Sequence, residues 1–296
     1  MSTQAAPNAV SALVEARVGA AARPLSPAAM KVIRDIERNP GLALTGSAAD
    51  LARRNGLSDA TVIRAVQALG FEGLAEMRQA LAAALQGTSP AERMRRTLSD
   101  VGEDAGRVID VALDAHQEAI TALRSAAVRE RLLAAVGLLS GAERIAVFGI
   151  GPSSLLARYA AMLLGRVGRQ ARCLDATGIA LADQLVGLQV GDALLILAYG
   201  RSYREVTATI DRARRMRLAM VLVTDSLDPK LARHADVVVP SQRGRAERVA
   251  LHGATLVVLE ALVLGVAATD RPRALEALEQ LNMLREAVLG TKGFAL

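Results

Sequence analysis

The sequence predicts an all-α N-terminal helix-turn-helix domain, followed by an α/β domain built on a doubly wound parallel sheet. Two observations predict this division. Two short capped helices meet at a glycine turn within residues 47–69, and from Arg144 onward short apolar runs alternate with helical stretches. A chain of 296 residues, of which 52% are hydrophobic, is long enough to bury a core in each part.

The first helix of the pair is predicted to begin at a capping box. Ser47 can accept a backbone N–H, and Asp50 stands three residues later, near the positive end of the helix dipole. Asn55-Gly56 supplies the left-handed turn that ends this helix, and Ser58 caps the next one. These signals predict two short helices that meet at a tight bend.

Apolar spacing divides the second helix into two faces. Val62, Val66 and Leu69 fall at i, i+4 and i+7, which predicts an inward face. The cap and the opposite face carry polar residues: Ser58, Thr61, Arg64 and Gln67. We expect these four to contact double-stranded operator DNA in the major groove. Plain helical packing is the alternative that the pattern alone leaves open.

Four short words in this region are more specific than the spacing. They are Leu51-Ala52, Gly56-Leu57-Ser58, Ala60-Thr61-Val62-Ile63-Arg64 and Leu69-Gly70-Phe71-Glu72-Gly73-Leu74. Together they resemble the N-terminal DNA-binding domain of RpiR/MurR-type transcription regulators, and the resemblance covers residues 25–85. It implies a transcription regulator that binds DNA. Ala65 departs from the family pattern, which usually has an aromatic residue at that position.

Breaks in the helical pattern set the predicted domain boundaries. A supporting helix should begin at Ser26-Pro27 and end at Asn39-Pro40, and another apolar stripe runs to Gln86. Gly87-Thr88-Ser89-Pro90 then breaks the pattern. We therefore predict a DNA-binding domain over 1–86, a linker over 87–101, and an α/β domain over 102–296 that binds an effector and oligomerises.

The alternation of segments predicts how the second domain folds. Strand-like runs occur at 145–148, 171–174, 193–198, 218–224 and 237–239. The stretches between them are long enough for helical crossovers, which favours a parallel, doubly wound sheet. Residues 246–266 then read as one helix that is apolar nearly all round. Because the sheet could cover only one side of it, we expect a homo-oligomer, either a dimer or a tetramer.

Ligands of open parallel sheets bind outside the carboxyl ends of the strands. The loop after the first strand reads Gly149-Ile150-Gly151-Pro152-Ser153-Ser154. Its two glycines allow close approach of the backbone, its serines offer hydroxyl groups, and the following helix points free N–H groups at the loop. The loop is neither a Rossmann fingerprint nor a P-loop, because the third glycine and the Gly-Lys-Ser/Thr are missing. It has the outline of a phosphate cradle.

Gly149-Ile150-Gly151 with Ser153, and Gly191-Asp192 before the 194–197 strand, carry a second resemblance. On these words residues 144–266 resemble a sugar isomerase (SIS) domain, the phosphosugar-binding module that usually follows this helix-turn-helix. The second ligand loop of that family usually reads Ser-x-Ser-Gly-x-Thr, then a basic residue and Glu. Here it reads Ala198-Tyr199-Gly200-Arg201-Ser202-Tyr203-Arg204-Glu205.

The resemblance implies a small anionic effector, a sugar phosphate or a sugar acid. In the altered loop an arginine stands in place of a glycine, and its planar guanidinium can bind an anion with two hydrogen bonds. The residues expected to contact the effector are Gly149, Gly151, Ser153, Ser154, Arg201, Ser202, Tyr203 and Glu205.

Two other functions stay open at this point. The chain could be a sugar-phosphate isomerase with an appended regulatory domain, or a DNA-binding protein whose α/β domain only dimerises. Isomerisation needs a general base, for which Glu205, Glu247 and His252 are candidates. Each has a simpler structural explanation, so we expect no enzymatic activity, no catalytic residue and no cofactor.

Composition limits the remaining possibilities. The single cysteine, Cys173, excludes an internal disulfide, and the three histidines share no metal-ligand spacing, so we expect no structural metal. No leader peptide and no membrane span is evident, which predicts a cytoplasmic protein. The net charge of +6 is only weak support for DNA binding.

Overall fold

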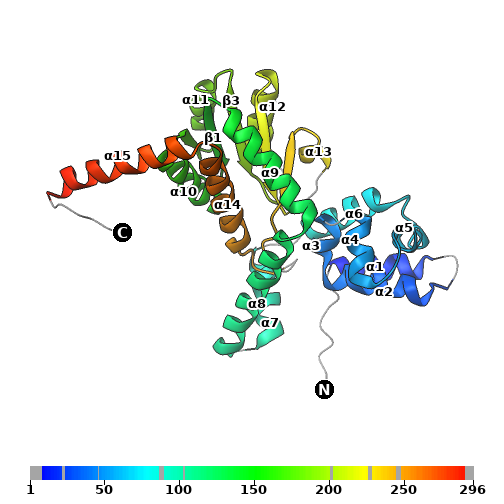
Figure 1. The fold of residues 1–296 in the computed structure, drawn as a ribbon. Helices are drawn as coiled ribbons and strands as arrows, with labels where there is room; N and C mark the ends of the chain where they lie inside the picture. Colours follow the sequence, from blue (N-terminus) through cyan, green and yellow to red (C-terminus); the bar gives the residue numbers. More distant parts are fainter. Residues whose placement is uncertain are drawn as a thin grey trace. The chain divides into compact units, whose positions relative to one another are not determined.

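The structure of the protein is a computed structural model (Figure 1). It describes residues 9–21, 24–45, 47–86, 90–102, 104–200, 203–225, 229–244 and 248–290. The chain divides into two compact units, each of which we describe by itself. The first comprises Met1–Ala119, Asp225–Asp228 and Gln242–His252, and the second comprises Ile120–Thr224, Pro229–Ser241 and Gly253–Leu296.

Short helices build the N-terminal part of the first unit. They are α1 (Ala9–Gly19), α2 (Pro27–Arg38), α3 (Pro40–Thr45), α4 (Ala48–Asn55), α5 (Asp59–Ala68) and α6 (Leu74–Gln86). Their apolar sides meet in one core, which includes Val32, Ile33, Ile36, Leu51, Val62, Val66, Leu69, Met77 and Leu81. The predicted helix-turn-helix domain is confirmed.

The local signals around the turn act as predicted. The Ser47 hydroxyl accepts the Asp50 N–H at 3.1 Å, and the Asp50 carboxylate accepts the Ser47 N–H at 2.8 Å, which completes the capping box. Gly56 ends α4 in the left-handed conformation, with φ 61° and ψ 41°. The Ser58 hydroxyl then caps α5 by accepting the Thr61 N–H at 3.3 Å.

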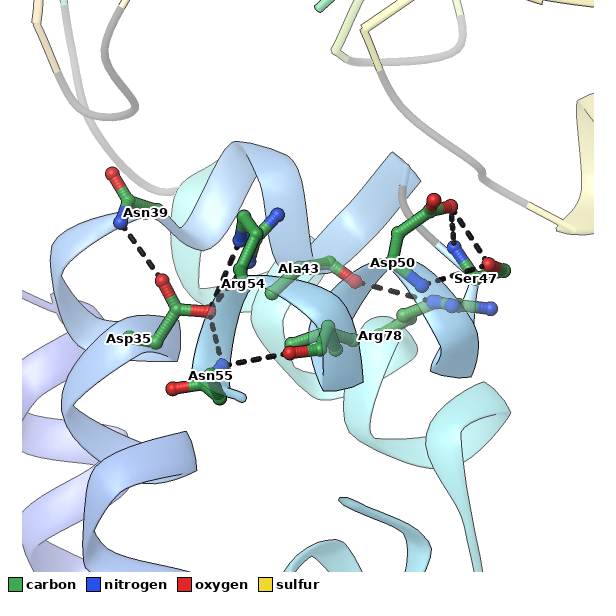
Figure 2. A network of polar contacts seen from close by, with 9 residues as sticks. Asp35, Asn39, Ala43, Ser47, Asp50, Arg54, Asn55 and Arg78 are labelled. Atoms are coloured by element: carbon green, nitrogen blue, oxygen red, sulfur yellow. Dashed lines mark hydrogen bonds and ion pairs between the residues drawn. The ribbon is translucent and has the colours of Figure 1, made fainter. Parts of the chain in front are cut away.

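A polar network fixes α2 to α4 (Figure 2). The Asp35 carboxylate accepts hydrogen bonds from Asn39 at 2.9 Å, from Arg54 at 2.7 Å and from Asn55 at 2.9 Å. The buried Asn55 amide also donates to the Leu51 carbonyl at 2.9 Å. Burial opposes ionisation of Asp35, but these hydrogen bonds and the Arg54 charge outweigh it, so the pKa of Asp35 is lowered.

Most of the predicted linker is helical. Its described residues form α7 (Pro90–Val101), and α8 (Ala105–Leu123) follows. Pro90 suits a helix start, and Glu92 pairs with Arg95 and Arg96 one turn later, so the segment forms a helix despite having few large apolar residues. The domain boundaries at 86 and 102 stay a prediction.

Two segments from beyond β4 and β5 belong to the first unit. The Val249 N–H donates to the Thr97 hydroxyl of α7 at 3.0 Å. Arg243 and Asp225 form an ion pair at 2.8 Å, and both side chains are largely buried. These contacts hold residues from the far end of the sequence in the same unit as α7.

The second unit contains a five-stranded sheet in the order β2-β1-β3-β4-β5, with every pair parallel. The strands are β1 (Arg144–Gly149), β2 (Gln170–Leu174), β3 (Asp192–Leu197), β4 (Ala219–Thr224) and β5 (Val237–Pro240). The order reverses between β1 and β3, so the predicted doubly wound fold is confirmed. The crevice between the loops that follow these two strands is the expected ligand position.

Helices cover both faces of this sheet (Figure 1). One face packs against α9 (Ala126–Gly141), α10 (Pro152–Arg166) and α14 (Gly253–Thr269), and the other against α11 (Ala180–Val186), α12 (Arg204–Arg215) and α13 (Pro229–Ala232). Successive residues of the central strands are therefore buried on both sides, as Ile145 and Ala146 are. The last helix is α15 (Arg271–Leu289).

The apolar helix predicted over 246–266 starts later in the sequence than expected. It begins at Gly253, because the Val249 and Leu251 N–H groups bond to Thr97 and to the Arg243 carbonyl instead of to a preceding turn. It packs against α9 and α10 as well as the sheet, so the chain itself covers more of it than the oligomer argument assumed. Within the described ranges, no single helix is both long and apolar enough to cross a membrane.

The Asp35 network predicts a pH-dependent loss of stability. Asp35→Asn should lower the free energy of unfolding at pH 7 by about 1.5–3 kcal/mol, because it removes charge-assisted bonds to Arg54 and Asn55. Since the folded pKa lies below the ordinary 3.8, the contribution of Asp35 is complete above that value and disappears as the pH falls through the folded pKa. Urea unfolding from pH 7 to pH 3 measures both effects.

The matched control is Asp114→Asn, at an exposed position on α8. It should change the stability by less than about 0.5 kcal/mol. Equal effects of the two substitutions at pH 7 would contradict the role given to the network.

Candidate functional site

The outward face of α5 gathers the four residues that the sequence assigned to DNA. The Ser58 and Thr61 hydroxyls lie 2.9 Å apart at the start of the helix, and the Arg64 guanidinium bonds to the Ala60 carbonyl at 3.2 Å. Ser58, Arg64 and Gln67 are exposed, whereas the opposite side of the helix is buried. A helix with one exposed polar face and one core face can enter a major groove.

Two residues near this surface were missed by the sequence analysis. Ile63 projects from the same side of α5 and is 39% exposed, which suits apolar contact with a thymine methyl. Arg17 of α1 donates to the Gly70 carbonyl at 3.1 Å, and its guanidinium lies 4.3 Å from the centroid of the Phe71 ring. Arg17 therefore ties α1 to the turn that ends α5. Its 53-residue separation from Gly70 leaves no local sequence signal.

A groove of about 670 Å³ runs beside α5. One wall carries Thr61, Arg64 and Gln67. The other wall, around the start of α2, is formed by Ala20, Ala21, Pro24, Leu25, Ser26 and Ala29. Small residues line much of it, including Ala29 and Ala68. Three of the residues predicted to contact DNA thus border an open depression next to the helix.

The first ligand loop lies between β1 and α10. An added Cβ on Gly149 would lie 2.5 Å from the Ser153 carbonyl oxygen, so only glycine permits this close approach of strand and helix. Gly151 has φ 57° and ψ −135°, a conformation that other residues rarely adopt, and an added Cβ there would meet nothing within 4 Å. Gly149 is therefore needed for packing, and Gly151 for an open turn.

The two serines of this loop are less available than the sequence suggested. Ser153 is 7% exposed, and the Ser154 hydroxyl donates to the Gly151 carbonyl at 2.7 Å. Pro152 has no N–H and the Ser154 N–H donates to the Gly151 carbonyl at 3.0 Å, so Ser153 carries the remaining backbone N–H of the first turn of α10. The loop presents backbone rather than hydroxyl groups.

The second ligand loop is described only at its ends. Arg201 and Ser202 lie outside the described residues. Tyr203 occupies the N-cap position of α12, is 54% exposed and makes no capping hydrogen bond. Glu205, in the first turn, accepts the Gly178 N–H at 3.4 Å. Its carboxylate thereby joins the start of α12 to the loop after β2.

Hydroxyl groups connect the ends of β3 and β5 to α14. Tyr199, just beyond β3, bonds through its phenolic oxygen to the Thr255 hydroxyl at 2.8 Å, and Ser241, just beyond β5, lies 3.3 Å from the same hydroxyl. Thr255 and Ser241 are fully buried. The sequence analysis missed this cluster, because its members come from segments that only the folded sheet brings together.

The pKa shifts of His252 and Cys173 favour structural roles for these two side chains. Burial, followed by the charge of Arg243, lowers the pKa of His252, so the imidazole is neutral at pH 7. Burial, followed by the charge of Asp175, raises the pKa of the Cys173 thiol to about 12. Glu247 is outside the described residues. In the part of the chain that the structure describes, no three His, Cys, Asp or Glu side chains gather as metal ligands.

Comparison with protein families identifies both parts of the chain. Residues 13–88 match the helix-turn-helix domain of the rpiR family, and residues 138–269 match the SIS domain. The chain belongs to the rpiR family of helix-turn-helix proteins with a SIS domain. The residues of the α4–α5 turn and of the β1–α10 loop fall inside these two matches.

Individual proteins are also similar to this chain. The protein is 29% identical over 251 residues to the "Bifunctional protein glk" of Paraburkholderia xenovorans and 28% identical to that of Burkholderia orbicola. These alignments cover 82% of this chain and only 38% of each relative. Two solved structures share the fold at 22% identity and a TM-score of 0.53.

One of these structures is the sugar isomerase domain of an RpiR transcription factor from Sphaerobacter thermophilus. The match covers 59% of this chain and 97% of the chain in that structure. The other is NanR of Vibrio vulnificus in complex with ManNAc-6P. The match covers 97% of this chain and 100% of the chain in that structure. The second likeness extends over both domains.

Gly149, at the end of β1, and Gly178, in the loop after β2, should differ in the cost of substitution. Gly149→Ala should destabilise the protein by about 3 kcal/mol, because the new methyl group meets the Ser153 backbone. Gly178→Ala is the control, since Gly178 has φ 60° but open space around an added Cβ, and should cost about 1 kcal/mol. Urea unfolding of both variants measures the difference, and equal costs would disprove the close packing at Gly149.

Proposed function

We propose that the protein is a transcription regulator that binds operator DNA through α5 and responds to a small anionic metabolite bound by its SIS domain. One observation carries this proposal: the outward face of an rpiR-family recognition helix exposes Arg64 and Gln67 beside Thr61. Recognition helices act in pairs on two half-sites, so we include a symmetric homo-oligomer in the proposal.

The effector of the proposal is a sugar phosphate or a sugar acid. The positive end of the α10 dipole and the open turn at Gly151 favour a negative group there. We further propose that Arg201 and Ser202 contact the same group, in place of the hydroxyl groups that this loop lacks. The ManNAc-6P found with NanR makes that compound a natural member of any test panel.

The proposed route of regulation passes through the segments that follow β4 and β5. Both segments continue strands that end at the ligand side of the sheet, and both are packed in the same unit as the DNA-binding helices. An effector that favours one arrangement of these segments would act on α7 through the bond between Val249 and Thr97. This would change the spacing of the paired α5 helices, and hence the affinity for the operator.

We infer that the SIS domain is not an isomerase. The Glu205 carboxylate is engaged by the Gly178 backbone, which supports a structural role for this candidate base. His252, which directly precedes α14 in the sequence, is half-buried and its pKa is lowered by burial, which also favours a structural role. Measured interconversion of aldose and ketose phosphates would support the isomerase alternative instead.

The general test is operator binding by the full chain, measured against a panel of phosphosugars and sugar acids. The proposal expects at least one compound to change the operator Kd. If the operator Kd is the same in the presence of every compound, the result would instead support the alternative in which the α/β domain only dimerises.

Arg64 provides the test of the DNA surface. Arg64→Ala should weaken operator binding by about 1–3 kcal/mol, with relaxed specificity if Arg64 meets a base edge and a uniform loss if it meets phosphate. Fluorescence anisotropy with the selected operator measures the loss. Arg107→Ala, at an exposed position on α8, is the control and should leave Kd unchanged. Unchanged binding by a folded Arg64→Ala protein would refute the assignment.

Arg201 provides the test of the effector site. Losing a charge-assisted contact costs about 1.5–3 kcal/mol, so Arg201→Ala should weaken effector binding about ten-fold or more and leave operator affinity without effector unchanged. Arg215→Ala, at the opposite end of α12, is the control. Calorimetry with the best compound of the panel decides, and equal affinity in wild type and Arg201→Ala would place Arg201 outside the site.

A further inference from the structure

The amino-terminal edge of the sheet carries a group of arginines that the functions above do not use. Residues 212–217, at the end of α12, read Arg-Ala-Arg-Arg-Met-Arg. The turn after α13 brings a further arginine to the same edge, because β4 and β5, which follow these two helices, are paired in parallel. We call the exposed members of this group the arginine edge: Arg214, Arg215, Arg217 and Arg233.

The positive charges of the arginine edge are not balanced by neighbouring carboxylates. None of its four guanidinium groups forms an ion pair with a residue that the structure describes. Partial burial, followed by the charges of Arg214 and Arg233, lowers the pKa of His234, and the charge of Asp211 opposes this only in part. A positive potential therefore extends over the turns that precede β4 and β5.

Arg217 occupies a position that glycine would fill with less strain. α12 ends in a Schellman motif, in which the Leu218 N–H donates to the Ala213 carbonyl and the Arg217 N–H to the Arg214 carbonyl, both at 3.0 Å. The motif holds Arg217 at φ 56°, in the left-handed region that disfavours a residue with a Cβ. Among the described residues, Arg217 is the only one other than glycine with a positive φ.

Other helices of the chain end in the same motif with glycine at this position. They use Gly56 after α4, Gly70 after α5 and Gly168 after α10. Stability alone would favour glycine at position 217 as well. The strain at Arg217 therefore points to a use for its side chain, and the charge of that side chain beside two further arginines supplies one.

We propose that the arginine edge binds the phosphate backbone of double-stranded DNA, as a second DNA surface separate from α5. A planar guanidinium matches a phosphate group with two hydrogen bonds, and a duplex presents a dense row of phosphates. Contacts of this kind need no particular base sequence. The inference goes beyond the proposed function, because neither the operator nor the effector takes part in it.

The composition of this surface favours a duplex over other polyanions. Residues 204–240 contain no Phe, Tyr or Trp, so the surface lacks the platforms on which unpaired bases stack. The described part of 211–240 exposes no large apolar side chain, which an acidic protein partner would use as an anchor. The exposed Asp236 carboxylate accepts the Met220 N–H at 2.8 Å, so it is engaged by the backbone at the start of β4.

Binding of the full chain to a long fluorescent duplex of random sequence tests the proposal. Anisotropy between about 50 and 200 mM salt gives the Kd and its salt dependence. In the edge variant, Arg214→Ala/Arg215→Ala/Arg217→Gly, the Kd should rise about ten-fold or more. The slope of log K against log salt should become shallower by about 2.7, since each lost phosphate contact contributes about 0.9. Binding through α5 remains in both proteins, so the difference reports the arginine edge.

The matched control is Arg107→Ala/Arg124→Ala/Arg129→Ala. It removes the same net charge at exposed positions of α8, of α9 and of the turn between them. It should leave the Kd and the slope close to those of the wild type. An unchanged Kd in the edge variant would overturn the proposal. An equal loss in the control would do so too, because it would assign the effect to net charge alone.

Arg217→Gly alone separates binding from a structural role. It should raise the midpoint of thermal unfolding, because glycine adopts φ 56° without strain. It should also make the salt slope shallower by about 0.9. A more stable Arg217→Gly protein that binds the duplex as the wild type does would exclude Arg217 from the surface.

Polyglutamate, added at the same concentration of negative charge as the duplex, tests the other class of partner. The duplex should stay bound in its presence. Preferential binding of polyglutamate that is lost in the edge variant would assign the surface to an acidic protein segment and overturn the proposal. These measurements use neither operator nor effector, so their failure is distinct from a failure of the Arg64→Ala or Arg201→Ala tests.

Discussion

Parallel pairing of all five strands is the constraint on which the sheet unit depends. Each strand must be followed by a crossover, which places helices on both faces and brings every carboxyl end to one edge. The reversal of strand order between β1 and β3 then leaves a crevice at that edge. The glycine turn at Gly151, the hydrogen bond between Glu205 and Gly178, and the hydroxyl cluster at Thr255 all lie at this edge, because each follows the carboxyl end of a strand.

The DNA-binding helices depend on a different kind of constraint. Their apolar core is small, and polar contacts between helices add to it in fixing the angles at which the helices pack. Asp35 holds α2 against α4, and Arg17 holds α1 against the turn after α5. Each contact joins separate elements, so the orientation of α5 depends on residues outside the surface predicted to contact DNA.

The sequence predicted those features whose cause is local. The capping box at Ser47, the left-handed Gly56 and the cap at Ser58 are each set by residues within one turn of one another. The alternation of apolar runs and helical segments likewise predicted the parallel sheet, since burial on both faces makes its strands continuous apolar runs.

Features set by distant neighbours could not be predicted in this way. The hydroxyl of Ser154 was expected to face a ligand, but it bonds to the Gly151 carbonyl. The start of α14 was placed too early, because nothing near residue 249 indicates that its N–H bonds to Thr97. The segment around Arg95 reads as a linker by composition, yet pairing with Glu92 stabilises a helix. In each case the competing partner is visible only in the folded chain.

The placement of residues 242–252 in the first unit has a consequence for how these two modules can recombine. The bond from Val249 to Thr97 joins residues 152 positions apart, and Arg243 pairs with Asp225 in the same unit. A DNA-binding fragment that ends after α8 would therefore lack residues 242–252, which pack in the same unit as α7. Grafting it onto another SIS domain preserves the unit only if the loops after β4 and β5 are transplanted with it.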